Sequence, residues 1–313
     1  MKKTLNFIAV IFFAFALISC GAKIDSSNWL TNLDEGKKAA QKENKKILLF
    51  FSNDEMDGKS AKLKEKIFNT EEFLDSFTEK YVLVNLDYSN SQYENEQEAI
   101  KGDLRIYELY NVSTLPYFLV LSSEGFVITQ LVFDDLADFD SVRLTFDDEE
   151  DTIRNFEELL AKTKNGSTES RLEAINQIVE ITEPSFAYQL MPLNELYISL
   201  DKKNKTGKVL NHLVALTYSK AIELSIDNEI EKAAEEFVKL TKNKILTDDD
   251  KQMAFYTAGY ILAQGGSENF EKILEYFQKA YEIAPESEAG QNIKMSIEKV
   301  QELINGENEE AQE

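Results

Sequence analysis

An apolar run followed by a polar turn and a helix-forming stretch constrains this chain more than any other feature. Ile47–Phe51 is apolar throughout and has the length of a strand, which suits a central parallel strand covered by helices on both faces. Residues 53–58 break this pattern, and residues 61–68 restart it with good helix formers around Leu63. The stretch therefore predicts a strand–loop–helix unit of an α/β domain.

This unit resembles the active-site segment of thioredoxin-like proteins, where Phe-Ser-x-x-x-Trp-Cys-x-x-Cys-x-x-Leu joins the central strand to the next helix. The residues that match the pattern are Phe51, Ser52 and Leu63. Met56 replaces the tryptophan, and Asp57 and Ser60 occupy the two cysteine positions. The resemblance implies a thioredoxin-like fold, a central mixed sheet flanked by helices, with its redox cysteines missing.

We call Asp57, Gly58, Lys59 and Ser60 the degenerate redox loop. In the family, a helix N-terminus lowers the thiol pKa so that a thiolate attacks a disulfide. A carboxylate cannot take that role, because the exchange passes through a mixed disulfide. We expect Asp57 and Ser60 to cap the helix by accepting hydrogen bonds from free backbone N–H groups. A catalytic use of Asp57 with Lys59 and a role in partner contact are the alternatives.

A second part of the resemblance lies at Val112–Pro116, which matches the family's Val-x-x-x-Pro segment. In thioredoxin-like proteins this proline is cis, faces the redox loop and precedes a strand. Because few X–Pro bonds are cis in general, the prediction that Pro116 is cis depends on the resemblance alone. A groove between Asp57 and Pro116 would then hold an extended peptide without cleaving it.

The resemblance covers residues 28–132, and the first domain is predicted to span 28–164. Within it we expect Trp29 to be a core residue. The expected elements are helices over 28–44, 71–80, 98–110 and 152–164, and strands over 81–87, 117–121 and 126–132, the last an antiparallel edge strand.

The segment 134–151 is strongly acidic. A calcium site is one interpretation, but the spacing lacks the glycine and the twelfth-position Glu of an EF-hand loop. We expect instead a solvated loop whose last carboxylates lie at the N-terminus of a helix, where negative charge is favourable. The sequence thus predicts no metal site and no cofactor.

The N-terminus has the layout of an export signal. Lys2 and Lys3 precede the apolar run Leu5–Ile18, which is short for a membrane span. The following Leu17-Ile18-Ser19-Cys20-Gly21 resembles the bacterial lipobox, whose cysteine carries lipid and becomes the mature N-terminus. We expect a signal peptide over 1–19, lipidation of Cys20 and a tether over 20–27, with an uncleaved anchor as the alternative. The protein would be lipid-anchored in the bacterial cell envelope, periplasmic or on the outer surface.

Cysteine count and charge narrow the function further. Cys20 is the single cysteine, so a lipidated chain has neither a free thiol nor a disulfide. The net charge of −23 opposes binding to nucleic acid and to anionic lipid. Contact with the membrane would come from the lipid, and partners would be proteins or peptides.

Beyond residue 165 the strand patterns end. Residues 165–170 have linker composition, residues 171–305 show apolar residues at helical spacing, and 306–313 form an acidic tail. Thr247 is expected to cap a helix that ends near residue 264. In the segment 270–285, three residues resemble the second helix of a tetratricopeptide repeat, with Ala258 as the small residue of the first: Phe277, Ala280 and Pro285.

No Walker loop, dinucleotide fingerprint or paired-carboxylate motif appears in the sequence. His212, the single histidine, lies on an apolar helix, so we expect a packed role and not metal binding. We therefore predict a redox-inactive thioredoxin-like domain and an all-helical, tetratricopeptide-like domain that together act as a protein-binding scaffold. The alternatives are a thioredoxin-family redox protein, which either retains some thiol-independent activity or has a partner that supplies the cysteines, and a holdase-type chaperone.

Overall fold

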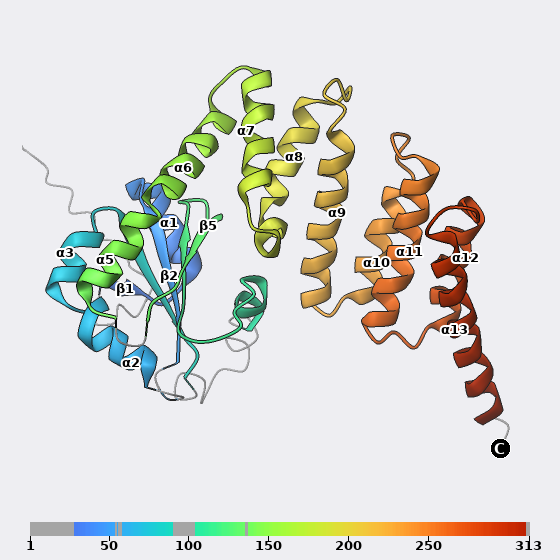
Figure 1. Cartoon of the computed structure of the whole chain (residues 1–313), viewed down its shortest axis with the longest axis horizontal. Coiled ribbons are helices and arrows are strands. Elements are labelled where there is room, and N and C mark those ends of the chain that lie inside the picture. The colour runs from blue at the N-terminus through green and yellow to red at the C-terminus, as the bar shows by residue number, and fades with distance from the viewer. Residues whose placement is uncertain (1–27, 54, 56–57, 90–103, 135–136, 311–313) are drawn as a thin grey trace, which may run out of the picture.

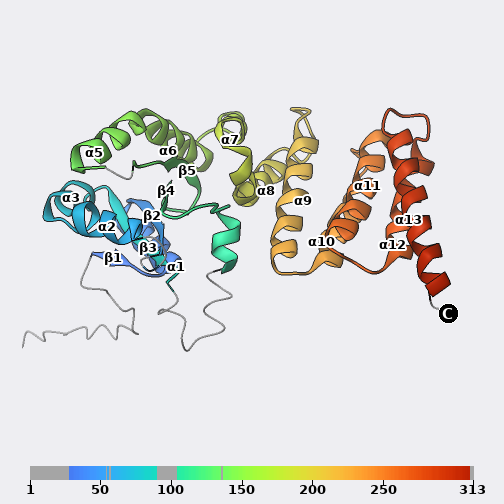
Figure 2. The ribbon, with the colours of Figure 1, turned by 60° about the horizontal axis from the view of Figure 1, so that its bottom comes forward.

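The computed structural model describes residues 28–53, 55, 58–89, 104–134 and 137–310. A mixed sheet with helices on both faces forms the N-terminal part, and a succession of helices extends away from it (Figures 1 and 2). Residues 1–27, which include the predicted signal peptide, Cys20 and the predicted tether, lie outside the described residues. Within the described ranges, none of the helices combines the length and hydrophobicity needed to cross a bilayer.

The sheet has five strands in the order β1-β3-β2-β4-β5. The strands are β1 (Trp29–Leu30), β2 (Lys46–Ser52), β3 (Tyr81–Asp87), β4 (Tyr117–Leu121) and β5 (Val127–Leu131). β3 runs parallel to both β1 and β2, whereas β4 is antiparallel to β2 and β5 is antiparallel to β4. The predicted mixed sheet and its antiparallel edge strand are confirmed.

Side chains of β2 alternate between two apolar cores, as the pleat of a strand requires. Leu48 and Phe50 lie in one core, and Leu49 and Phe51 lie in the other. The helices around the sheet are α1 (Leu33–Glu43), α2 (Lys59–Leu63), a π-helix η1 (Lys64–Phe68), α3 (Glu71–Phe77), a helical segment 104–109, α5 (Phe139–Asp148) and α6 (Glu150–Lys164). Because both faces of β2 are covered, the strand is apolar at every position from 47 to 51.

The N-terminal helix is shorter than the sequence predicted. Asn32 caps α1 by accepting a hydrogen bond from the Glu35 backbone N–H (3.0 Å), so the helix begins at Leu33 and not at residue 28. Trp29 lies before the cap and pairs with Leu83 in the sheet. Its side chain is 4% exposed and donates a hydrogen bond to the Phe68 carbonyl, which confirms it as a core residue.

The acidic segment 134–151 is not a loop throughout, because α5 lies within it. Asp138 and Ser141 form a capping box at its start, and Val142 and Phe146 point into the core. The carboxylates of Asp140, Asp147 and Asp148 are exposed, so the high charge concealed the helical spacing. α6 accordingly begins at Glu150, two residues before the predicted start.

The second half is all-helical, as predicted. Its elements are α7 (Thr168–Ile181), the 3₁₀-helix η3 (Pro184–Leu190), α8 (Met191–Leu200), α9 (Val209–Ile226), α10 (Ile230–Leu240), α11 (Asp248–Gln264), α12 (Phe270–Ile283) and α13 (Gly290–Glu310). Thr247 caps α11 through a capping box with Asp250. α13 runs into the predicted acidic tail as far as Glu310.

Several contacts join the helices to the sheet. In α6, Ile153 belongs to a sheet core, whereas Phe156 and Leu160 belong to the next helical core. The predicted linker 165–170 holds Ser167, which caps α7, and the first residues of that helix. Because α6 packs into both cores, the helical part is attached through a packed element and not only through a flexible joint. The domain limits themselves remain predictions.

Candidate functional site

The degenerate redox loop lies where β2 ends and α2 begins. Gly58 has φ +64°, a conformation that favours glycine, and it precedes the first residue of α2 without capping it through a side chain. Lys59 is the first helical residue. Met56 and Asp57 lie outside the described residues, so the expected helix cap and the catalytic use of Asp57 stay predictions.

Ser60 does not cap the helix, contrary to expectation. Its side chain is fully buried, and its hydroxyl accepts a hydrogen bond from the Asn53 backbone N–H (3.2 Å). It therefore ties the start of α2 to the residue that follows β2. Burial explains the difference, because a hydroxyl that points beneath the loop meets the backbone of the preceding strand end and not the free amides of the helix.

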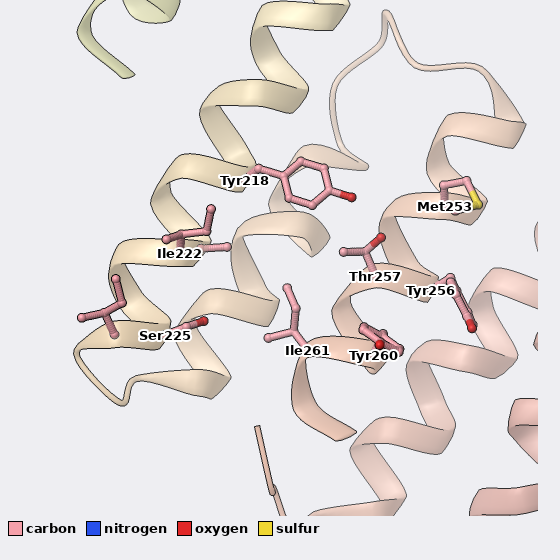
Figure 3. A pocket seen from close by; sticks show the side chains of 10 residues that line it. Tyr218, Ile222, Ser225, Met253, Tyr256, Thr257, Tyr260 and Ile261 are labelled. Carbon is pink, nitrogen blue, oxygen red and sulfur yellow. The ribbon is translucent and has the colours of Figure 1, made fainter. Parts of the chain in front are cut away.

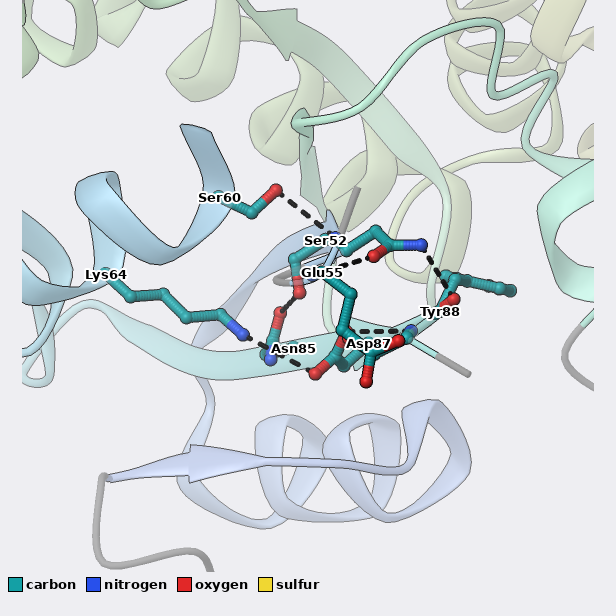
Figure 4. Close-up of polar contacts among 9 residues, drawn as sticks. Ser52, Glu55, Ser60, Lys64, Asn85, Asp87 and Tyr88 are labelled. Carbon is teal, nitrogen blue, oxygen red and sulfur yellow. Dashed lines mark hydrogen bonds and ion pairs between the residues drawn. The ribbon is translucent and has the colours of Figure 1, made fainter. Parts of the chain in front are cut away.

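A polar cluster supports this end of the sheet (Figure 4). Ser52 donates a hydrogen bond to the Asn85 side chain (2.8 Å), and the Asn53 side chain donates one to the Tyr88 carbonyl (2.9 Å). These bonds join the end of β2 to β3 and to the residue after it. The loop thus starts from an end of the sheet that is held by hydrogen bonds. In the thioredoxin-like family this part of the fold positions a cysteine sulfur, which is absent here.

An ion pair lies in the same cluster. Lys64 Nζ is 3.9 Å from Asp87 Oδ2, both side chains are mostly buried, and the ammonium lies 5.7 Å from the centre of the Phe50 ring. The carboxylate also accepts a hydrogen bond from the Ser89 hydroxyl (2.5 Å). Each polar side chain named here has a partner, so the cluster helps to hold this end of the sheet together.

The Leu115–Pro116 peptide bond is cis. β4 pairs with β2 so that Tyr117 lies opposite Phe51, and the same register places Pro116 opposite Ser52. The proline is therefore at the sheet end from which the degenerate redox loop begins. The described residues of the two segments that carry the resemblance thus lie at the same end of the sheet.

Among the described side chains, no group of three or more His, Cys, Asp or Glu residues is arranged to hold a metal ion. Asp138 belongs to a helix cap, and Asp147 pairs with Arg143 at 3.1 Å. These two carboxylates of the acidic segment thus have structural contacts of their own.

A second candidate site, which the sequence did not predict, lies between α9 and α11. It is a cavity of about 480 Å³ whose lining contains no charged side chain. The residues that line it are Tyr218, Ala221, Ile222, Ser225, Ile226, Met253, Tyr256, Thr257, Tyr260 and Ile261. Figure 3 shows side chains of the two helices facing one another across it. We call this site the α9–α11 groove.

The α9–α11 groove gathers exposed apolar side chains that a core would normally cover. Tyr218, Ile222, Met253 and Tyr260 are 41 to 50% exposed. Single exposed apolar residues are ordinary, but a contiguous apolar hollow marks an interaction surface. The sequence signal that points to it is a pair of helices that are apolar on more than one face.

Two family models match separate parts of the chain. A model described as thioredoxin-like matches residues 28–122, and one described as an uncharacterised protein C-terminal domain matches residues 209–306. The second match contains both walls of the α9–α11 groove. A comparison with curated proteins gave no match.

Among solved structures, one described as DsbH oxidoreductase is 18% identical, with a TM-score of 0.34. The match covers 38% of this chain and 82% of that one. The thioredoxin-like model spans the strands from β1 to β4, the degenerate redox loop and Pro116. Residues 28–122 are a thioredoxin-like domain, and a separate helical C-terminal domain follows it.

Proposed function

We propose that this protein is a lipid-anchored, redox-inactive thioredoxin-like protein that binds protein or peptide partners in the bacterial cell envelope. The observation that carries the proposal is the absence of sulfur from the degenerate redox loop. Ser60 stands at one cysteine position and Asp57 at the other, and Cys20 is the single cysteine of the chain.

The chemistry of disulfide exchange supports the inactive assignment. Each exchange step passes through a mixed disulfide, which needs a sulfur atom on the enzyme. The Ser60 hydroxyl is buried and bonded to the Asn53 amide, so it offers neither sulfur nor an exposed nucleophile. What the domain keeps is a supported loop beside a cis-proline, which suits binding.

An insulin-reduction assay with the purified full chain tests this assignment. We expect no turnover above the rate of the reductant alone. The double variant Asp57→Cys, Ser60→Cys restores the cysteine spacing and serves as the matched thiol-bearing control. Turnover by the unaltered chain would refute the redox-inactive assignment.

The proposed anchor has its own test. Cells fed an alkyne-tagged fatty acid should label the unaltered chain and the Ser19→Ala variant, which keeps a small residue before the cysteine. Cys20→Ser should lose both the label and the membrane fraction. Labelling that survives this substitution would contradict lipidation at Cys20.

A holdase is the second candidate, because the α9–α11 groove exposes apolar side chains that an unfolded client could cover. Light scattering of a chemically unfolded client would show suppressed aggregation at equimolar protein. Unchanged aggregation would leave the binding of specific folded partners as the function. Crosslinking in intact cells followed by mass spectrometry would identify those partners.

A further inference from the structure

We propose that the α9–α11 groove is a docking site for a cationic amphipathic helix of a partner protein. This proposal deepens the proposed binding function by naming its surface and the chemistry of its partner. It does not depend on the degenerate redox loop, which lies in the other domain.

The lining determines what the buried face of the partner must be. None of the ten lining residues carries a charge, and the hydrogen-bonding groups are hydroxyls of Tyr, Ser and Thr. A charged group placed there would lose its hydration without gaining a counter-charge. The occupant therefore presents apolar side chains, and methionine and tyrosine at the wall adapt to them.

The shape of the site favours a helix. α10 packs against both α9 and α11, so the groove has two helical walls above a helical support. On α9 the lining runs from Tyr218 to Ile226, about two helical turns, and on α11 from Met253 to Ile261. A partner helix would fill this space with anchors at positions i, i+3 or i+4 and i+7.

Charge around the groove selects a cationic partner. Asp249 lies one turn before Met253 on the same face of α11, is exposed, and has no ion-pair partner in the described ranges. At the other end, Asp227 and Glu229 follow α9, but Asp227 pairs with Arg105 and Glu229 pairs with Lys232. The carboxylate of Asp249, together with the net charge of −23, therefore complements a Lys or Arg residue that flanks an apolar stripe.

The same charge disfavours a second copy of this chain as the occupant. With a net charge of −23, two copies repel one another, and pairing through an apolar groove would have to overcome that repulsion. Dimerisation is therefore an outcome of the test that would overturn the proposal.

The binding test uses two synthetic helices with the same apolar stripe, one carrying Lys and the other Glu on its polar face. Fluorescence anisotropy with the full chain should show the Lys peptide bound at least about tenfold more tightly, with the preference weakening as salt is added. Equal affinity for both peptides, or tighter binding of the Glu peptide, would overturn the cationic assignment.

Groove variants locate the binding. Ile222→Ser and Met253→Ser remove exposed apolar anchors, so each should weaken the Lys peptide about tenfold without unfolding the chain. Met295→Ser and Leu303→Ser are matched controls, because these α13 residues are 66% and 47% exposed and lie outside the groove. Equal losses in both sets, or none in the groove set, would refute the site.

Two further measurements separate this inference from the broader function. Light scattering after size-exclusion chromatography should give a monomer, and a dimer abolished by Met253→Ser would assign the groove to a second copy. In intact cells, crosslinked partners that persist in the groove variants would overturn the inference and leave the proposed function standing. A complete lack of protein partners would overturn the proposed function itself.

Discussion

His212 provides a pH-dependent contribution to stability that can be calculated from its surroundings. The side chain is 3% exposed, and its ring stacks on Tyr197 with the centroids 3.6 Å apart. Nδ1 lies 2.7 Å from Asn194 Oδ1 and Nε2 lies 3.1 Å from Asn176 Oδ1. Both partners are uncharged amides, so neither provides a counter-charge for a protonated ring.

Burial lowers the pKa of His212 to about 4, and the positive charge of Lys208 acts in the same direction. In the unfolded chain the pKa is about 6.5. The unfolded state therefore binds the proton first, and stability is lost as the pH falls from about 6.5 to about 4. From this difference in pKa, the free energy of unfolding falls by about 2 kcal/mol between pH 7.5 and pH 5, and by about 3 kcal/mol in all below pH 4.

Urea unfolding followed by far-UV circular dichroism measures this loss, because the signal comes mainly from the helices. The His212→Gln variant keeps a polar group near the Nε2 position but does not titrate, so its stability should change by about 2 kcal/mol less over the same pH interval. His212 is the single histidine, so no other imidazole contributes. Parallel pH profiles for the two proteins would refute this account of the buried ring.

Three other substitutions test packing and hydrogen bonding, each by urea unfolding. Gly259→Ala places a Cβ 2.6 Å from Phe277 Cε1, so we expect a loss of about 1–3 kcal/mol despite the better helix propensity of alanine; an unchanged or higher midpoint would contradict this packing. Gln189→Ala leaves the Val127 N–H without its 2.6 Å acceptor and should cost about 1–3 kcal/mol, whereas Gln189→Glu keeps an acceptor and should cost less; equal losses would argue against the bond. Asp201→Asn should lower stability at neutral pH, because hydrogen bonds from the following loop lower the pKa of this carboxyl. The ionised carboxylate therefore stabilises the fold at neutral pH, and this stabilisation is lost only as the pH falls through the lowered pKa. A variant as stable as the unaltered chain would refute this account.

The sheet could be predicted because the hydrophobicity of each strand residue indicates whether that residue is buried. Ile47–Phe51 is apolar at every position, which happens only when both faces of a strand are covered, and Tyr81–Asp87 was delimited to the residue by its flanking polar segments. Local sequence was a poorer guide where a tertiary contact decides the outcome. Trp29 joins a strand because Leu83 is available to pair with it, and Ser60 bonds Asn53 because β2 ends beside it.

The attachment of the helical part to the sheet could not be predicted for the same reason. Gln189 lies on a short 3₁₀-helix, yet its side chain accepts from the Val127 N–H and donates to the Val127 carbonyl on the edge strand β5. Arg105 similarly pairs with Asp227 at the end of α9, 122 residues away. Such pairs join residues whose separation in sequence carries no periodic signal, so only the folded chain reveals them.

The α9–α11 groove shows how a helix can be assigned correctly and its surface still be misjudged. Periodicity identifies a helix from its apolar residues, but it does not tell which of several apolar faces is covered. On α9, Ala221 is buried whereas its neighbour Ile222 is 41% exposed, and on α11 Ala254 is buried whereas Met253 is 47% exposed. Each of these two helices has more apolar surface than its neighbours cover. Because α10 packs against both α9 and α11, the two uncovered faces lie next to each other. These uncovered faces form the surface that we propose is covered by a partner helix.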